Sequence, residues 1–355
     1  TFTDITGHWA AGYIKYCQAN GIIAGKSATK FCPNDNVTGI EAAKMLLVTA
    51  GYKADKEGLV GAAWANKTLG LAEENSLLDD VNTSLAAALP RQYAAQIIYN
   101  ALDMDTVKYE DGEVVKNETT KTEMKQVPNY AADGKTILSY STVATTVTEN
   151  ETVGEKFMNL KKTTAVLEDV SKTSGKETFE LTLDKSTVDE NKTTDDKGKA
   201  LYNFTNVKKD YSDLKYQMVT VLYKNNDKSK VYGVYATKDN TQQTGILKNL
   251  KMDGNKAKLD DTKYDLADKN TVYVNGKSWT ENKKDSNNIK SFIDTYGNDS
   301  DTKYTNAAYM QPTEVKLLAT DGSTDYSILN VKTFAVAKVT AVGSDYINVS
   351  FKKGD

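Results

Sequence analysis

The chain has 355 residues, enough for two to four domains, and 39% of them are hydrophobic. Its net charge of −3 gives no electrostatic basis for binding nucleic acid or an anionic membrane surface. One histidine and two cysteines leave almost nothing from which to build a catalytic triad or a transition-metal site. No apolar run approaches the ~18 residues that span a bilayer. We therefore expect no enzyme activity, no resident cofactor and no membrane insertion.

Residues 2–52 predict two helices joined by a polar loop. The first follows polar residues at 6–8, carries an apolar stripe of aromatic side chains, and stops at Gly21, because glycine most easily adopts a left-handed C-terminal conformation. The second begins at Thr38, and Glu41 three residues later has the spacing of a capping box. The predicted stripe of the first helix consists of Trp9, Tyr13, Tyr16 and Cys17, with Ile14 beside it.

The order of motifs in this segment resembles an S-layer homology (SLH) repeat, the module that attaches secreted bacterial proteins to the cell wall. The motifs are Phe2-x-Asp4-Ile5, His8-Trp9-Ala10, Tyr13-Ile14, Gly21-Ile22-Ile23-x-Gly25, Phe31-x-Pro33 and Val37-Thr38-x-x-Glu41-Ala42-Ala43-x-Met45-Leu46. The family usually has Thr-Arg-Ala-Glu where this chain has Thr38-Gly39-Ile40-Glu41, so the arginine is absent. The resemblance implies a surface protein of a Gram-positive-type, clostridial-like bacterium. Since the family usually builds three repeats, we expect another before Thr1.

Residues 53–106 resemble a second, degenerate SLH repeat after the first at 1–52. Trp64 lies at the start of its first predicted helix, and Pro90-Arg91 stands where the family has Thr-Arg. Arg91 is the single arginine among the 45 lysines and arginines of the chain. A chance surface arginine is the alternative, but retention at this position suggests a need for the planar guanidinium fork that lysine lacks.

Beyond residue 106 the pattern changes from helical to alternating. Residues 107–150 are a charged linker or an exposed hairpin, and recurring first strands divide the rest into β domains at 151–240 and 241–334 and the start of a further one at 335–355. A short helix is expected near Ile289, Phe292 and Ile293. The predicted fold class is thus multidomain α plus all-β, with helical SLH repeats followed by serial β-barrel-like or β-sandwich domains.

The resemblance implies that the repeats bind a secondary cell-wall polysaccharide whose terminal sugar is often pyruvylated. Carried over by position, the candidate binding residues are Arg91, Trp64, Asp4, Trp9 and Gly39. A guanidinium can hold the sugar carboxylate with two bonds, and an indole can stack on the ring. Gly39 replaces the expected cation, which predicts a weak first groove. For Trp9 we favour a core position over ligand stacking, and for His8 a local cap without chemistry.

Two further features stay open. Cys17 and Cys32 form either a disulfide, worth ~3 kcal/mol for a loop of ~15 residues, or two packed thiols. Three acidic pairs could hold Ca²⁺ through hard oxygen ligands, although turn formation explains them equally well. These pairs are Asp79/Asp80, Asp260/Asp261 and Asp321/Asp325.

These observations favour a secreted, non-catalytic structural protein of the cell wall and cell surface, of S-layer type. The SLH repeats would attach it to wall polysaccharide, and the β domains would assemble a lattice by self-association or provide display. Two alternatives are an anchor and spacer for a surface enzyme whose catalytic domain lies outside this span, and an adhesin.

Overall fold

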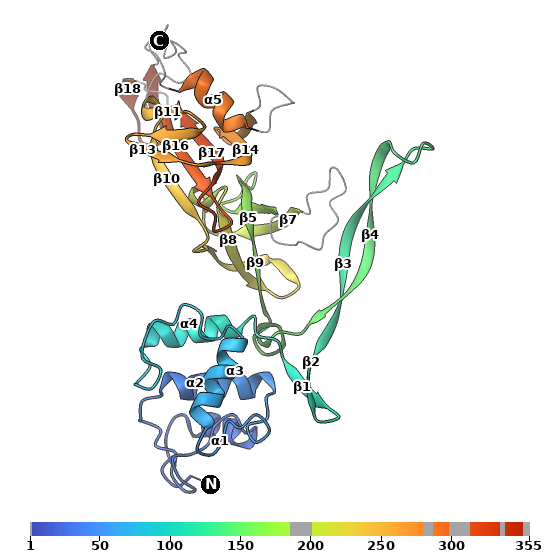
Figure 1. Ribbon diagram of the computed structural model, residues 1–355, viewed down its shortest axis with the longest axis vertical. Helices are drawn as coiled ribbons and strands as arrows, with labels where there is room; N and C mark the ends of the chain where they lie inside the picture. The colour runs from blue at the N-terminus through green and yellow to red at the C-terminus, as the bar shows by residue number, and fades with distance from the viewer. Residues whose placement is uncertain (1, 185–200, 280–286, 298–312, 334–337, 351–355) are drawn as a thin grey trace. The chain divides into compact units, whose positions relative to one another are not determined.

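The computed structural model describes residues 2–184, 201–279, 287–297, 313–333 and 338–350 (Figure 1). The chain divides into two compact units, residues 1–162 and 163–355. The first contains four helices and two β-hairpins, and the second is built mainly from strands. None of the helices in the described ranges is both long and apolar enough to cross a membrane.

The four helices of the first unit are α1 (Ala11–Ala19), α2 (Gly39–Ala50), α3 (Trp64–Glu74) and α4 (Arg91–Ala101). The predicted capping box of α2 is confirmed: the Glu41 N–H donates to the Thr38 hydroxyl at 3.2 Å, and the Thr38 N–H donates to the Glu41 carboxylate at 2.9 Å. α2 ends at Gly51, where φ is 115° and a Cβ would lie 2.2 Å from the Val107 carbonyl oxygen. Glycine is therefore required at this turn.

Helices α2, α3 and α4 share one hydrophobic core, whereas α1 belongs to another. The shared core buries Leu47 of α2, Ala72 of α3 and Ile97 of α4 completely. α1 buries only Ile14, in a small cluster with Phe2 and Ile5. α2 is thus packed with α3 and α4, apart from α1, the helix that precedes it in the chain.

The predicted apolar stripe of α1 does not face a core. Trp9, Tyr13 and Tyr16 are 84%, 72% and 67% exposed. The core position favoured for Trp9 is therefore wrong. Its ring meets that of Tyr13 edge-on at 6.5 Å on the surface. The physical reason is that α1 packs through Ile14, on another face of the helix.

Two hairpins complete the first unit: β1 (Val107–Glu110) with β2 (Glu113–Lys116), and β3 (Glu118–Tyr130) with β4 (Ile137–Asn150). Backbone bonds tie the base of the second hairpin, since the Thr106 N–H donates to the Glu151 carbonyl at 2.7 Å and the Asn117 N–H to the Thr106 carbonyl at 2.8 Å. A π-helical turn, η1 (Gly154–Met158), follows. Of the two alternatives for residues 107–150, a linker or a hairpin, the structure contains hairpins.

The second unit begins with a five-stranded sheet in the order β7-β6-β5-β8-β9. Its inward side chains, among them Leu167, Leu183, Phe204 and Val221, form one core. The strands are β5 (Leu160–Lys172), β6 (Phe179–Asp184), β7 (Leu201–Val207), β8 (Met218–Lys224) and β9 (Asp227–Ala236), with a short helical turn η3 (Ser212–Leu214).

A second five-stranded sheet has the order β10-β16-β17-β14-β15, and β14 runs parallel to β17. Its strands are β10 (Thr241–Ile246), β14 (Leu266–Val274), β15 (Lys277–Trp279), β16 (Thr313–Ala319) and β17 (Tyr326–Thr333). A three-stranded sheet shares its core and follows the turn η4 (Leu247–Asn249); its strands are β11 (Leu250–Asp253), β12 (Lys256–Leu259) and β13 (Thr262–Tyr264).

Helix α5 (Asn288–Tyr296) packs on the same core and confirms the helix expected near residue 289, with Ile289, Phe292 and Ile293 buried. The Asn287 side chain caps it by accepting from the Lys290 N–H at 3.0 Å. A last hairpin is formed by β18 (Lys338–Val342) and β19 (Ile347–Ser350).

The two large sheets share a three-strand order. A first strand, β5 or β10, lies next to a late hairpin, β8–β9 or β16–β17. The remaining strands differ, because β6 and β7 extend the sheet beyond the first strand, whereas β14 and β15 extend it beyond the hairpin. The molecule is mostly β with few helices, as predicted, but no sheet among the described residues is closed, and the barrel-like form is not confirmed.

Candidate functional site

Arg91 is the first residue of α4, and its side chain is exposed. Pro90 precedes the helix and supplies no side-chain cap. Within the described ranges, Arg91 forms no ion pair or hydrogen bond with another side chain. The N-terminus of a helix carries free N–H groups and a partial positive charge, so it attracts anions, and a guanidinium at the same place adds a full charge. This end of α4 is thus suited to a carboxylate.

The corresponding end of α2 is already occupied. Glu41 caps the helix from within and also forms an ion pair with Lys26 at 2.6 Å. Burial alone would raise the pKa of Glu41, but the bonds from Lys26 and Thr38 outweigh it and hold the pKa below its usual value. The carboxylate therefore stays charged at neutral pH and fills the position that a ligand carboxylate would take.

Gly39 contributes no side chain to a groove and is buried by Leu85. A Cβ at Gly39 would lie 2.6 Å from Leu85 Cδ2 and 3.0 Å from Leu85 Cα. The backbone is joined here too, since the Ile40 N–H donates to the Leu85 carbonyl at 3.1 Å and residues 38 and 88 form an antiparallel bridge. The missing arginine is thus accompanied by a leucine that fills its space.

Trp64 lies at the start of α3, half-buried, with the Lys44 ammonium 5.3 Å from the centre of its indole ring. Burial lowers the pKa of Lys44, and no carboxylate pairs with it among the described residues. Sequence reasoning missed Lys44. The available signal was that it is the only charged residue between Glu41 and Lys53.

Asp4 has a structural role in the first repeat. Its carboxylate accepts the Phe31 N–H at 3.0 Å and the Cys32 N–H at 2.8 Å, and these bonds lower its pKa. His8 accepts the Ala10 N–H on Nδ1 at 3.2 Å, a local bond just before α1, but it is not the helix cap, because α1 has no side-chain cap. Cys17 and Cys32 are free thiols, so the structure contains the unbonded alternative.

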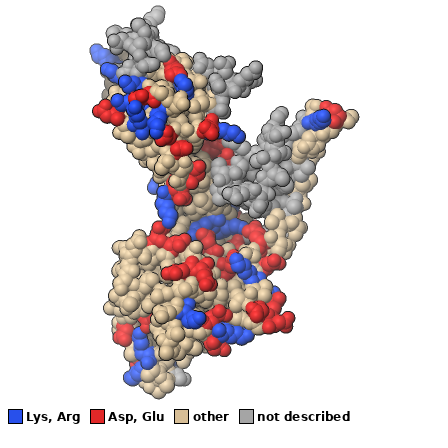
Figure 2. All heavy atoms as spheres, in the orientation of Figure 1, with Lys and Arg blue, Asp and Glu red and all other residues tan. Residues whose placement is uncertain are grey.

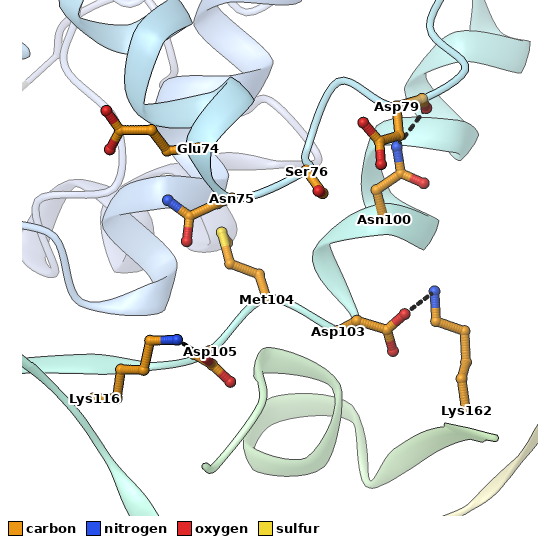
Figure 3. A pocket seen from close by; sticks show the side chains of 10 residues that line it. All are labelled: Glu74, Asn75, Ser76, Asp79, Asn100, Asp103, Met104, Asp105, Lys116 and Lys162. Carbon is orange, nitrogen blue, oxygen red and sulfur yellow. Dashed lines mark hydrogen bonds and ion pairs between the residues drawn. The ribbon is translucent and has the colours of Figure 1, made fainter. Parts of the chain in front are cut away.

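A pocket of about 340 Å³ lies elsewhere in the first unit (Figure 3). None of the candidate polysaccharide-binding residues lines it, whereas Asp79 of the first acidic pair does. Two ion pairs lie in the lining of the pocket: Lys116 with Asp105 and Lys162 with Asp103, each at 2.7 Å. Glu74 and Asp79 add two further carboxylates. With four carboxylates and two ammonium groups, the pocket has an excess negative charge of two and does not suit an acidic sugar.

The distribution of charge on the surface, like the net charge, gives no basis for binding nucleic acid. Figure 2 shows basic and acidic side chains interspersed over the visible face, without a large basic patch. No group of three or more His, Cys, Asp or Glu side chains in the described ranges could hold a metal ion. At two of the three acidic pairs an Asp stabilises a turn or loop: Asp321 accepts the Ser323 N–H at 3.0 Å, and Asp260 accepts from the Asn249 amide.

Residues 1–43 match the family model of the S-layer homology domain. The "Middle cell wall protein" of Brevibacillus brevis is 28% identical over 123 residues, which cover 34% of this chain and 11% of that protein. The "Cell surface protein" of Thermoanaerobacter kivui is 28% identical over 139 residues, covering 37% of this chain and 17% of that protein. The chain thus spans less than a fifth of either relative. No solved structure matches significantly.

The matched segment contains α1, the capped start of α2 and the loop tied by Asp4. It covers the motifs that suggested the family as far as Ala43 and ends before Met45 and Leu46. These observations identify the chain as a secreted, cell-surface protein with an S-layer homology domain at its N-terminus.

Proposed function

We propose that the helical part of this protein attaches it to the cell wall by binding an acidic secondary cell-wall polysaccharide, such as one with a pyruvylated terminal sugar. The observation that carries the proposal is the exposed guanidinium of Arg91 at the uncapped start of α4. A ketal-linked carboxylate would accept two bonds from the guanidinium and further bonds from the free N–H groups of the first turn.

Lys44 and Trp64 provide a second, weaker binding element near α2. A half-buried ammonium without a carboxylate partner attracts an anion, and the indole offers an apolar face to a sugar ring. Lys44 thereby supplies a positive charge in the repeat that lacks one at Gly39. Trp9, exposed just before α1, is a further stacking surface.

The β sheets are proposed to be structural. They would assemble a lattice by self-association or provide display, without catalysis or a resident cofactor, and Ca²⁺ at the acidic pairs is left as a separate possibility. The same proposal includes the predicted domain form, in which the open sheets belong to sandwich-like or barrel-like domains. An anchor and spacer for an enzyme domain, or an adhesin, remain the alternative proposals.

The test is co-sedimentation with purified cell-wall sacculi, before and after extraction of the polysaccharide. Arg91→Ala should weaken binding by about tenfold to a hundredfold, because a charge-assisted paired contact is worth ~1.5–3 kcal/mol. Arg91→Lys keeps the charge but loses the fork and should also weaken binding. Lys44→Gln should have a smaller effect.

The matched control is Lys67→Gln, which removes an exposed charge from the surface of α3. It should bind as the wild type does. Equal binding by Arg91→Ala and the wild type, or undiminished binding to extracted sacculi, would reject the proposed site. Retention of binding at ~0.15 M salt would distinguish a paired contact from loose surface attraction.

A further inference from the structure

The β3–β4 ribbon pairs with no other strand of the described chain. The two strands are joined by 13 antiparallel residue pairs, from Glu118↔Asn150 to Tyr130↔Ile137. Figure 1 draws no third strand along the ribbon. The side chains of the ribbon that the structure describes are all exposed or half-buried, so no core is found among them. Because an isolated two-stranded ribbon is at best marginally stable in water, this length of unpaired edge requires an explanation.

The two edges differ in sequence. β3 contains two lysines, two glutamates and Pro128, features by which natural proteins prevent an exposed strand from pairing with another chain. β4 has no charged residue and no proline between 137 and 148. Most of that run is Thr, Val, Ile or Tyr, residue types that favour strands. One edge of the ribbon is thus protected and the other is not.

The unprotected edge is long and held at its base. Its twelve uncharged residues span roughly 40 Å in a strand, and an antiparallel pairing along them would form about twelve backbone hydrogen bonds. At the base, the Asn150 amide donates to the Asp105 carboxylate at 3.0 Å, and the Thr106 hydroxyl donates to Glu151 at 3.0 Å. The free edge is therefore presented by an anchored ribbon.

We propose that the β4 edge, residues 137–148, is a self-association surface that pairs antiparallel with β4 of a second copy of this chain. The charges at its ends favour this partner. Lys135 precedes the run and Glu149 follows it, so two copies related by a two-fold axis near residue 142 bring Lys135 of each toward Glu149 of the other. Glu149 also pairs with Lys161 at 2.9 Å, which holds that end in place.

This inference names the contact for the self-association proposed above, and it does not depend on wall binding. Sedimentation velocity of the full chain over ~1–200 µM, without wall material, should show a concentration-dependent dimer. The double variant Thr146→Lys with Thr148→Lys adds charge to β4 and should weaken the dimer about tenfold.

The matched control places the same charges on β3. Thr120 and Thr122 are the cross-strand partners of Thr148 and Thr146, and all four side chains are exposed. Thr120→Lys with Thr122→Lys should therefore leave the dimer unchanged. Circular dichroism would verify that both variants are folded.

A cross-linking experiment locates the axis. In a Cys17→Ser, Cys32→Ser background, Val143→Cys lies close to the proposed two-fold axis and should form disulfide-linked dimers on mild oxidation, whereas Thr122→Cys should not. A chain that is monomeric throughout the concentration range, or an equal response of the two strands, overturns the proposal. Sacculus binding is measured separately, so failure of wall attachment would be recognised as a different result.

Discussion

The starts of α2 and α4 are built in opposite ways, although the sequence suggests that they are corresponding places. α2 has the carboxylate of the Thr-Arg-Ala-Glu tetrad, Glu41, but glycine in place of arginine. α4 has the arginine, Arg91, but no acid in its first turn and no cap. The first helix end is closed by its own carboxylate and the second is open to a foreign one. Stabilisation is thus seen at the start of α2, and ligand binding is proposed for the start of α4.

The two candidate tryptophans, Trp9 and Trp64, also lie in different surroundings. Trp64 is half-buried beside Lys44, because α3 packs on α2. Trp9 is 84% exposed, because α1 packs through Ile14 in a cluster of its own. Similar motif positions therefore have different surroundings, and only the packing of the helices decides which indole meets a cation.

The largest effect is expected from restoring the missing arginine. Gly39→Arg should lower the free energy of unfolding by about 1–3 kcal/mol, because the new side chain overlaps Leu85. Leu85→Ala in the same chain should recover part of the loss, since it removes the Cδ2 atom in conflict. Urea denaturation of the two single variants and the double variant measures this coupling. Additive losses would contradict the assigned overlap.

The cap of α2 should contribute slightly less. Thr38→Ala removes the hydroxyl that accepts the Glu41 N–H and should cost about 1 kcal/mol of unfolding free energy, again by urea denaturation. Thr38→Ser keeps the hydroxyl and should retain most of the stability. If serine proved as costly as alanine, packing of the Thr38 methyl rather than the cap would be responsible.

A smaller change should make α4 resemble α2. Gln92 is exposed in the first turn of α4, and Gln92→Glu places a negative charge at the positive end of the helix. The expected gain in stability is about 0.3–1 kcal/mol, together with weaker sacculus binding, because the new carboxylate competes with that of the ligand. Gln92→Lys is the opposite control, and tighter binding by Gln92→Glu would argue against an anionic ligand here.

The smallest effect should appear on acidification. The pKa of Glu41 is lowered in the folded chain, so its stabilising contribution is complete above the unfolded-state pKa and is lost as the pH falls through the lower folded-state value. The difference in unfolding free energy between wild type and Glu41→Gln should therefore shrink in acid. Denaturation at a series of pH values measures it, and a difference that is constant with pH would contradict the assignment.

The sequence by itself determined the features that depend on neighbouring residues. The Thr38–Glu41 cap, the short helix at residues 288–296, the change from helices to strands beyond residue 106 and the family of residues 1–43 could all be predicted. Each depends on hydrogen bonds or periodicity within a few turns of chain, so the information lies in adjacent residues.

Only the tertiary structure decided which surfaces are covered. Three features depend on residues that are distant in sequence. Leu85 fills the space beside Gly39, the Lys44 ammonium lies over the Trp64 ring, and the aromatic stripe of α1 faces outward. An amphipathic pattern shows that a helix has an apolar face, but burial of that face requires a partner, and the partner is fixed by how the helices pack. The sequence therefore shows the aromatic stripe as a pattern, but the core position predicted for Trp9 was wrong.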